Sequence, residues 1–250
     1  MNATPGLSAV QFLRLYKHFD GQHLFQGLDL TLPAQRITAV VGASGCGKST
    51  LLRLINGLLR PDAGEVRVFG QAIDYLDLPR LRRRIGYAVQ QIGLFPHLTV
   101  RENIAILAER ERWPRSRLRA RIEQLLHMMD LPSALLGRYP HEISGGQAQR
   151  VGLCRAMMLE PPLLLLDEAF SAVDPITRAE VHAHFQALQR AEPRTVVLVT
   201  HDVGEAMRLA NYLVVMGPGQ ILQAETPQRI RQHPTGDRVS RLLETGSWNA

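Results

Sequence analysis

The 250-residue chain has few cysteines and no apolar run long enough to cross a bilayer. Its two cysteines, Cys46 and Cys154, cannot make the disulfide framework of a small secreted domain, and we expect neither a bridge nor a metal site from them. The longest apolar stretch, around residues 163–166, suits a buried strand. The first residues also lack the basic and apolar segments of a secretory signal. We therefore expect a soluble, cytosolic protein.

The chain also lacks any nucleic-acid-binding signature, although its formal net charge is +6. A basic surface suits nucleic acid or the anionic face of a membrane. The basic residues cluster in residues 80–84 and 110–121, which we interpret as solvated helix faces. We expect no nucleic-acid partner.

The most informative segment is residues 42–49, which match the phosphate-binding pattern G-x-x-x-x-G-K-[ST]. A buried strand is predicted before this segment and a helix over residues 49–58. Between such elements, successive backbone N–H groups form a nest for anions. A glycine-rich turn that matches by chance is the alternative, and the correct flanks disfavour it. The sequence therefore predicts a site for a nucleoside triphosphate.

Within this loop, Lys48 can reach the β- and γ-phosphates, and the hydroxyl of Ser49 can ligate Mg²⁺. Cys46 lies at a helix N-terminus, which favours thiolate, but we assign it no chemical role. The residues expected to contact the nucleotide are Gly42, Ser44, Gly45, Cys46, Gly47, Lys48, Ser49 and Thr50.

A second constellation is the apolar run 163–166, which ends in Asp167 and Glu168. Such a run is typical of a strand buried on both faces, and ligands of open α/β sheets gather at the strands' carboxyl ends. Asp167 would then hold Mg²⁺, directly or through water, and Glu168 could accept a proton from the attacking water. Acidic residues at strand ends are common, so this pair is specific only in combination with the phosphate loop.

Strand-like runs stop near residue 90 and resume near residue 163. Between residues 116 and 159 the pattern is helical, with Leu118, Ile122, Leu125 and Met129 on one stripe. Residues 212–216 and 220–223 predict a hairpin, and the tail beyond Glu225 a short helical segment. The strand-like runs are residues 10–15, 37–41, 65–69, 85–89, 163–166, 195–200 and 212–216.

Residues 143–150 read Ile-Ser-Gly-Gly-Gln-Ala-Gln-Arg. Ser144 and Gln147 have the spacing of a capping box, so the segment could simply start a helix. Two consecutive glycines weaken a first turn, yet they let an anion approach the backbone closely. The segment resembles the signature motif of the ATP-binding cassette (ABC) ATPases, which combine it with a phosphate loop upstream and an apolar-Asp-Glu strand downstream.

This resemblance implies an α/β fold, a P-loop NTPase core of the ABC ATPase type with an inserted helical subdomain and an N-terminal antiparallel β subdomain. It implies one ABC ATPase domain over residues 1–250. The predicted parts are a nucleotide-binding core in residues 1–92 and 161–225, a helical signature subdomain in residues 93–160, and a helical tail in residues 226–250.

The resemblance also implies further site residues. Phe19 stands where the family places an aromatic ring on adenine, with Tyr16 as a weaker candidate. Gln90 matches the glutamine loop that senses Mg²⁺ and the transport partner, so the implied Mg²⁺ ligands are Ser49, Gln90 and Asp167. His201 corresponds to a histidine that contacts the γ-phosphate, and the neighbouring Asp202 suits a helix cap. The implied catalytic residues are Lys48, Gln90, Glu168 and His201.

By the same resemblance, two copies pack head to tail around ATP. Ser144, Gly145, Gly146 and Gln147 of one copy then close over the nucleotide held by the other. Asp174 belongs to the loop after the catalytic glutamate, and because Pro175 follows it, Asp174 is equally a good N-cap.

A narrower similarity lies in residues 83–100, 138–142 and 174–178, which resemble importers of quaternary amines such as glycine betaine, choline, carnitine and proline-like osmoprotectants. It implies an ATPase subunit at the cytoplasmic face of the membrane, bound to a separate permease and served indirectly by an extracytoplasmic binding protein. Ala169 and Ser171 depart from the family's usual proline and glycine, and we expect no regulatory CBS domains. The alternatives are another ABC importer, an exporter or lipid transporter, or a soluble cassette ATPase.

Overall fold

The structure, a computed structural model, describes residues 8–89, 93–171, 175–191 and 193–245. The chain splits into two compact units. The first unit comprises Met1–Arg82 with Arg194–Ala250, and the second comprises Arg83–Pro193. The sequence predicted boundaries between a core, a helical subdomain and a tail at residues 92, 160 and 225, and these boundaries stay a prediction.

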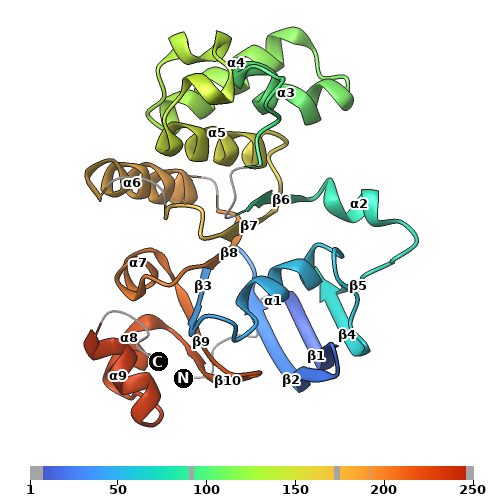
Figure 1. Cartoon of the computed structure of the whole chain (residues 1–250), viewed down its shortest axis with the longest axis vertical. Helices are drawn as coiled ribbons and strands as arrows, with labels where there is room; N and C mark the ends of the chain where they lie inside the picture. Colours follow the sequence, from blue (N-terminus) through green and yellow to red (C-terminus); the bar gives the residue numbers. More distant parts are fainter. Residues whose placement is uncertain (1–7, 90–92, 172–174, 192, 246–250) are drawn as a thin grey trace. The chain divides into compact units, whose positions relative to one another are not determined.

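The first unit contains an antiparallel sheet in the order β2-β1-β4-β5 (Figure 1). This sheet corresponds to the N-terminal β subdomain that the family resemblance implied. Asp20 and Gly21 join β1 to β2, and both have positive φ (48° and 77°), as a two-residue hairpin turn requires. The strands are β1 (Ser8–Phe19), β2 (Gln22–Pro33), β4 (Ala63–Val68) and β5 (Gln71–Ala72).

The same unit contains β3 (Ile37–Gly42), which pairs in parallel with β8 (Thr195–Val199) on one side and with β9 (Tyr212–Gly217) on the other. The predicted hairpin is confirmed, because β10 (Gln220–Glu225) pairs antiparallel with β9. Every residue of β3 and β8 is buried, which explains their continuous apolar sequences.

Helices cover one face of this sheet. Ala39 and Val41 of β3 and Leu213 and Val215 of β9 pack in one buried cluster with Val203, Ala206, Ile230, Val239 and Leu242 from three helices. These are α7 (Val203–Leu209), α8 (Pro227–Gln232) and α9 (Asp237–Thr245). The last two are helices in the part of the chain after Glu225, where the sequence predicted helix, and they lie beside each other at the end of the chain coloured red in Figure 1. The first unit also contains α1 (Lys48–Ile55) and α2 (Leu78–Arg82).

The second unit pairs β6 (Ile85–Ala88) in parallel with β7 (Leu163–Asp167) and is otherwise helical. The predicted stripe is confirmed, since Leu118, Ile122, Leu125 and Met129 are all buried. The helices are α3 (Val100–Arg110), α4 (Arg115–Met128), α5 (Gly145–Met157) and α6 (Pro175–Ala191), with the 3-10 turns η1 (Ser133–Gly137) and η2 (Pro140–Glu142).

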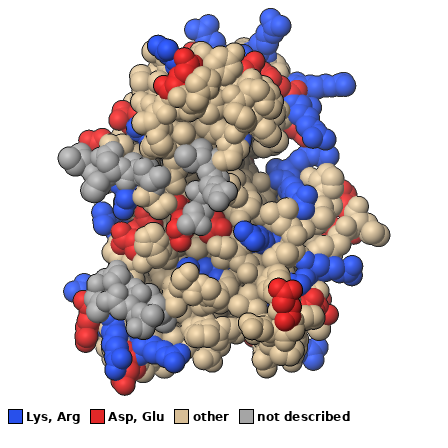
Figure 2. All heavy atoms as spheres, viewed as in Figure 1, with Lys and Arg blue, Asp and Glu red and all other residues tan. Residues whose placement is uncertain are grey.

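The basic residues of α3 and α4 pair with acidic ones. Arg117 lies 3.0 Å from Glu160 and Arg119 lies 2.9 Å from Glu123, both at exposed positions. In Figure 2, blue and red side chains accordingly lie next to one another on the helical part of the chain. These pairs support the interpretation of a solvated helix face for Arg117 and Arg119. The interpretation was wrong for Arg121, which is 4% exposed and donates to the backbone carbonyl of Met157 at 2.9 Å.

Within the described ranges, no helix is both long enough and apolar enough to traverse a bilayer.

Candidate functional site

The predicted phosphate loop connects β3 to α1. The helix begins at Lys48 and ends at Ile55, whereas the sequence predicted residues 49–58. Gly45 and Gly47 have φ values of 77° and 105°, in the left-handed region that favours glycine. Within the loop, the backbone N–H of Cys46 donates to the carbonyl of Ala43 at 3.3 Å. The chain therefore turns tightly between strand and helix, as an anion nest requires.

The two glycines serve different purposes. A Cβ atom at position 47 would lie 2.6 Å from Cζ of Phe25, so the packing of β2 excludes a side chain there. A Cβ atom at position 45 would meet nothing within 4 Å. Gly45 is exposed, together with its neighbour Ser44, so this part of the loop is open to a ligand.

Lys48 is buried, with 8% of the residue exposed. Its ammonium group donates to the carbonyl oxygens of Gly42 and Ala43, both at 2.8 Å. The loop thus holds a positive charge at its own centre. Ser49 and Thr50, in the first turn of α1, are partly exposed and carry hydroxyl groups.

Cys46 lies at the helix N-terminus, a position that favours thiolate, but its surroundings act in the opposite direction. The side chain is buried, which raises the pKa of its thiol, and this effect outweighs the opposing influence of Lys48.

His201 follows β8. Because β3 and β8 are parallel, with Val40 opposite Val199, the phosphate loop and His201 lie at the same edge of the sheet. His201 is exposed. The predicted cap is confirmed, since Asp202 accepts a hydrogen bond from the backbone of Glu205 at 2.9 Å and so starts α7.

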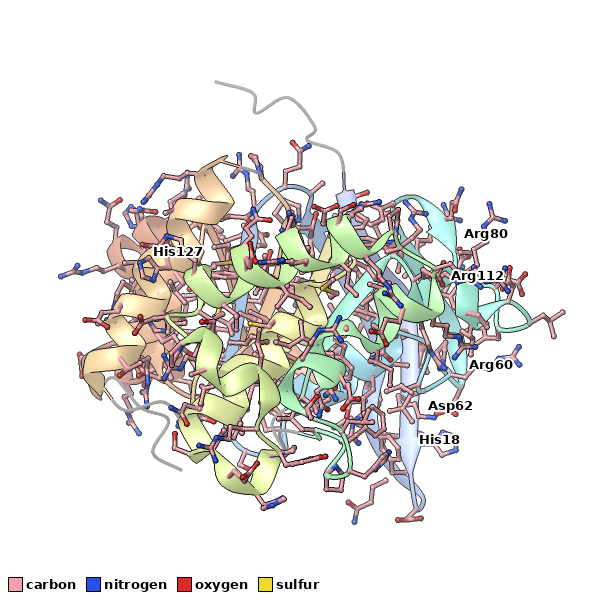
Figure 3. All side chains as sticks on the ribbon, turned by 90° about the horizontal axis from the view of Figure 1, so that it is seen from above. His18, Arg60, Asp62, Arg80, Arg112 and His127 are labelled. Atoms are coloured by element: carbon pink, nitrogen blue, oxygen red, sulfur yellow. The ribbon has the colours of Figure 1, made fainter. Side chains whose placement is uncertain are left out.

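Phe19 ends β1 and is 42% exposed. The ammonium group of Lys17 lies 5.2 Å from the centre of its ring. Asp62 accepts hydrogen bonds from Lys17 at 3.0 Å and from the backbone of His18 at 2.7 Å, and these donors lower the pKa of its carboxyl group. Figure 3 shows His18 and Asp62 beside each other. Asp62 therefore fixes the strand end that presents the ring of Phe19.

Tyr16, the weaker aromatic candidate, is similarly exposed, at 45%. Its hydroxyl group lies 3.1 Å from where a Cβ atom at Gly27 would be, so its ring packs over the neighbouring strand.

In the second unit, Asp167 ends β7 and is buried, with only 4% of the residue exposed. The hydroxyl of Tyr87 on β6 donates to its carboxylate at 3.5 Å. Glu168 follows in the left-handed region, with φ of 49°, which is uncommon for a residue with a side chain. Such backbone conformations cluster at functional sites.

The signature segment forms the start of α5. Ser144 accepts a hydrogen bond from the backbone of Gln147 at 3.2 Å, and the side chain of Gln147 accepts one from the backbone of Ser144 at 3.0 Å. The capping box is therefore real. Ser144 and Gly145 are exposed and Gly146 is partly exposed, so the turn also faces solvent. The capping box is compatible with an exposed turn, and the role of this turn in binding the nucleotide stays a prediction.

Two predicted site residues, Gln90 and Asp174, lie outside the described residues. Two others were missed. Tyr87 contacts Asp167, and Gln149 donates to the backbone of Glu168 at 3.1 Å. The sequence carried a weak signal for Tyr87 alone, because it lies on the strand beside the Asp-Glu strand.

Within the described part of the chain, no group of three or more His, Cys, Asp or Glu side chains could hold a metal by itself. The candidate Mg²⁺ ligands Ser49 and Asp167 belong to different units. A hydroxyl and a carboxylate oxygen are the donor types that Mg²⁺ prefers.

Comparisons with known proteins identify the same family as the sequence motifs did. The family model for the ABC transporter matches residues 25–171. The chain belongs to this family. The sequence-based assignment to the ABC ATPases and to their fold is thereby confirmed.

The chain resembles two curated proteins in particular. It is 41% identical over 237 residues to the glycine betaine/carnitine/choline transport ATP-binding protein OpuCA of Bacillus subtilis, covering 95% of this chain and 62% of that protein. It is 43% identical to the glycine betaine uptake system ATP-binding protein YehX of Escherichia coli, covering 94% and 76%. The chain therefore spans less than two thirds of OpuCA.

Solved structures resemble this ABC cassette as a whole. The dimeric cassette MJ0796, bound to ADP and Pi, superposes with a TM-score of 0.79 at 29% identity, covering 87% of this chain and 98% of that one. CbiO1 from Clostridium perfringens, part of a cbiONQ complex, gives a TM-score of 0.82 at 26% identity, covering 96% and 97%.

Proposed function

We propose that this cassette binds and hydrolyses ATP as the energising subunit of an importer of quaternary-amine osmoprotectants. One observation carries the proposal: the phosphate loop, with Lys48 at its centre, lies at the same sheet edge as His201. The names of OpuCA and YehX supply the class of cargo. The chain would act at the cytoplasmic face of the membrane, bound to separate permease subunits that a binding protein serves.

Each residue has a distinct role in this proposal. The loop N–H groups and Lys48 neutralise the phosphates, Phe19 stacks on adenine, and His201 contacts the γ-phosphate. Mg²⁺, held by Ser49 and Asp167 with Gln90, would neutralise charge that develops on the transferred phosphoryl group. Glu168 orients the attacking water and accepts its proton.

The proposed working form is a head-to-tail dimer. The exposed turn of Ser144, Gly145 and Gly146 offers a second set of backbone N–H groups, at the N-terminus of the 13-residue helix α5. In the dimer it would close over the γ-phosphate that the partner copy holds, together with Asp174 of the loop after Glu168. ATP then holds the two copies together, and hydrolysis lets them separate.

Trapping this dimer tests the proposal. Glu168→Gln keeps the size of the side chain but cannot accept the proton, so ATP should bind without turnover. Size-exclusion chromatography should show a dimer of this variant in ATP and a monomer in ADP. A Glu168→Gln, Lys48→Ala double variant should stay monomeric in both nucleotides. A variant that remains monomeric in saturating ATP would contradict the composite site.

A second class of cargo is supported by a specific observation. The chain is 43% identical over 227 residues to the sulfate/thiosulfate import ATP-binding protein CysA of Thermosynechococcus vestitus, covering 91% of this chain and 67% of that protein. The two classes of cargo can be distinguished experimentally. The cassette is copurified with its permease, and uptake of labelled glycine betaine and of labelled sulfate is measured in vesicles. ATP-dependent uptake of sulfate alone would overturn the assignment to quaternary amines.

A further inference from the structure

Three hydrogen bonds in the second unit meet at the backbone carbonyl of Glu168. It accepts hydrogen bonds from the side-chain amide of Gln149 at 3.1 Å and from the hydroxyl and backbone N–H of Ser171 at 2.8 and 3.2 Å. Glu168 itself has the uncommon positive φ of 49°. An L-residue keeps this conformation only where its surroundings over-determine it, and these three donors do so.

The backbone conformation at residue 168 sets the direction in which its carboxylate leaves the chain. A general base works only within hydrogen-bond reach of the proton that it abstracts. A rotation about this backbone would move the carboxylate by more than that tolerance. The donors to the carbonyl therefore decide where the carboxylate points, because they hold the backbone from which it leaves.

Gln149 is set apart from Ser171 by its place in the fold. It is buried, with 4% exposed, on the same helix that begins at the Ser144 cap. This helix packs closely on β6, where a Cβ atom at Gly86 would collide with the carbonyl of Ala156. One rigid element thus carries the signature turn at its end and the anchor of Glu168 further along.

We infer that Gln149 is a positioning residue that couples the signature turn to Glu168. The inference rests on the proposed function, in which Glu168 is the base and the signature turn meets the nucleotide of the partner copy. Gln149 then links the two nucleotide sites of the dimer. Closure of α5 on the partner's nucleotide fixes the base that serves the nucleotide of its own copy.

Gln149→Met tests the inference, because methionine keeps the length and volume of glutamine but cannot donate a hydrogen bond. In steady-state ATPase assays of the purified chain, kcat should fall at least about tenfold, since the base is misplaced. KM for ATP should stay within about twofold and the Hill coefficient should fall toward one, because binding is intact and the link is lost.

Arg121→Met is the matched control for the stability of α5. Arg121 is as buried as Gln149, with 4% exposed, and it donates from α4 to the carbonyl of Met157 at the end of α5 at 2.9 Å, so the variant also removes a side-chain bond to backbone, but at the other end of the helix. It should lower the melting temperature and leave kcat within about twofold. A fall in kcat as large as that of Gln149→Met would show that α5 merely needs to be stable, and would overturn the inference.

The outcomes separate this inference from the proposed function. A wild-type chain that releases no phosphate contradicts the proposed function, and the inference falls with it. An active wild type with a Gln149→Met variant of equal kcat overturns the inference alone. Should Gln149→Met not fold, Ser171→Ala removes the second side-chain donor at an exposed position, and an unchanged kcat there would equally overturn the role of the carbonyl.

Discussion

The ammonium group of Lys48 lies 2.8 Å from the carbonyl oxygen of Gly42, six residues earlier at the end of β3. A second bond of equal length joins it to Ala43. The loop therefore holds a positive charge in a fixed position, bonded to the backbone that connects β3 to α1. Electrostatic groups that are already in place contribute the most to catalysis.

Replacing Lys48 with alanine should abolish most phosphate release. We expect kcat/KM to fall by about two to three orders of magnitude, because one preorganised charge is lost. Malachite-green assays at several ATP concentrations measure this. Arg53→Ala, on an exposed position of the same helix, is the control for loss of a nearby positive charge. Activity of Lys48→Ala within tenfold of wild type would show that the loop does not grip the phosphates through this residue.

Substitutions of the two loop glycines should have opposite main effects, one on stability and the other on nucleotide binding. Gly47→Ala places a Cβ atom 2.6 Å from Phe25 at a φ of 105°, so it should destabilise the protein by about 2 to 4 kcal/mol without any ligand. Gly45→Ala meets no protein atom within 4 Å and should cost about 1 kcal/mol of backbone strain, while it weakens nucleotide binding more strongly. Thermal melts with and without ATP distinguish them. Equal losses of stability in the two variants would contradict this division of roles.

All seven strands expected from the sequence are present, because each is a short run of continuous or alternating apolar residues. The two-residue β5 was missed, and so was β2. Its apolar residues Phe25 and Leu28 are three apart, which breaks the alternation that identifies a strand. The structure gives the reason: Leu15 pairs with Leu28 and Tyr16 with Gln26, so Gly27, with φ of 73°, is an extra residue in β2. A bulge reverses which face the following residues occupy, and no local pattern reveals it.

The residues of the candidate site were likewise predictable only where a local sequence pattern indicates them. The phosphate loop and the capping box were predictable because each is a contiguous pattern with a local physical cause. The contact of Gln149 with Glu168 spans 19 residues and depends on how α5 packs, so no spacing rule indicates it. The burial of Cys46 was likewise decided by packing against other elements.

The exposed ring of Phe19 should determine part of the affinity for the nucleobase. Phe19→Ala should weaken ATP binding by about 5- to 150-fold, since stacking of a base on an aromatic side chain contributes about 1 to 3 kcal/mol. Phe19→Trp should retain it. Tyr16→Ala, which removes a ring that packs over Gly27, should have a smaller effect. Titration calorimetry with the Glu168→Gln variant measures each affinity without turnover. A larger loss in Tyr16→Ala than in Phe19→Ala would reassign the stacking residue.

Acid should destabilise the helical part of the second unit through the cap of α3. Glu102 accepts a hydrogen bond from the backbone of Thr99 at 2.7 Å, and this bond holds the pKa of the carboxyl group below its ordinary value of 4.5. A carboxyl whose pKa is lower in the folded state stabilises the protein above its unfolded pKa, and this contribution is lost as the pH falls through the folded pKa. The melting temperature should therefore fall between about pH 5 and pH 3.

Glu102→Gln isolates this contribution. The glutamine oxygen can still accept from Thr99, but it does not titrate, so the melting temperature should depend less steeply on pH below 5 while it is slightly lower at pH 7. Glu123→Gln, at a carboxylate that pairs with the exposed side chain of Arg119, supplies the comparison for loss of one negative charge. If both variants follow the wild-type curve in acid, the cap of α3 does not contribute to acid sensitivity, and the bond between Glu102 and Thr99 stabilises the two protonation states equally.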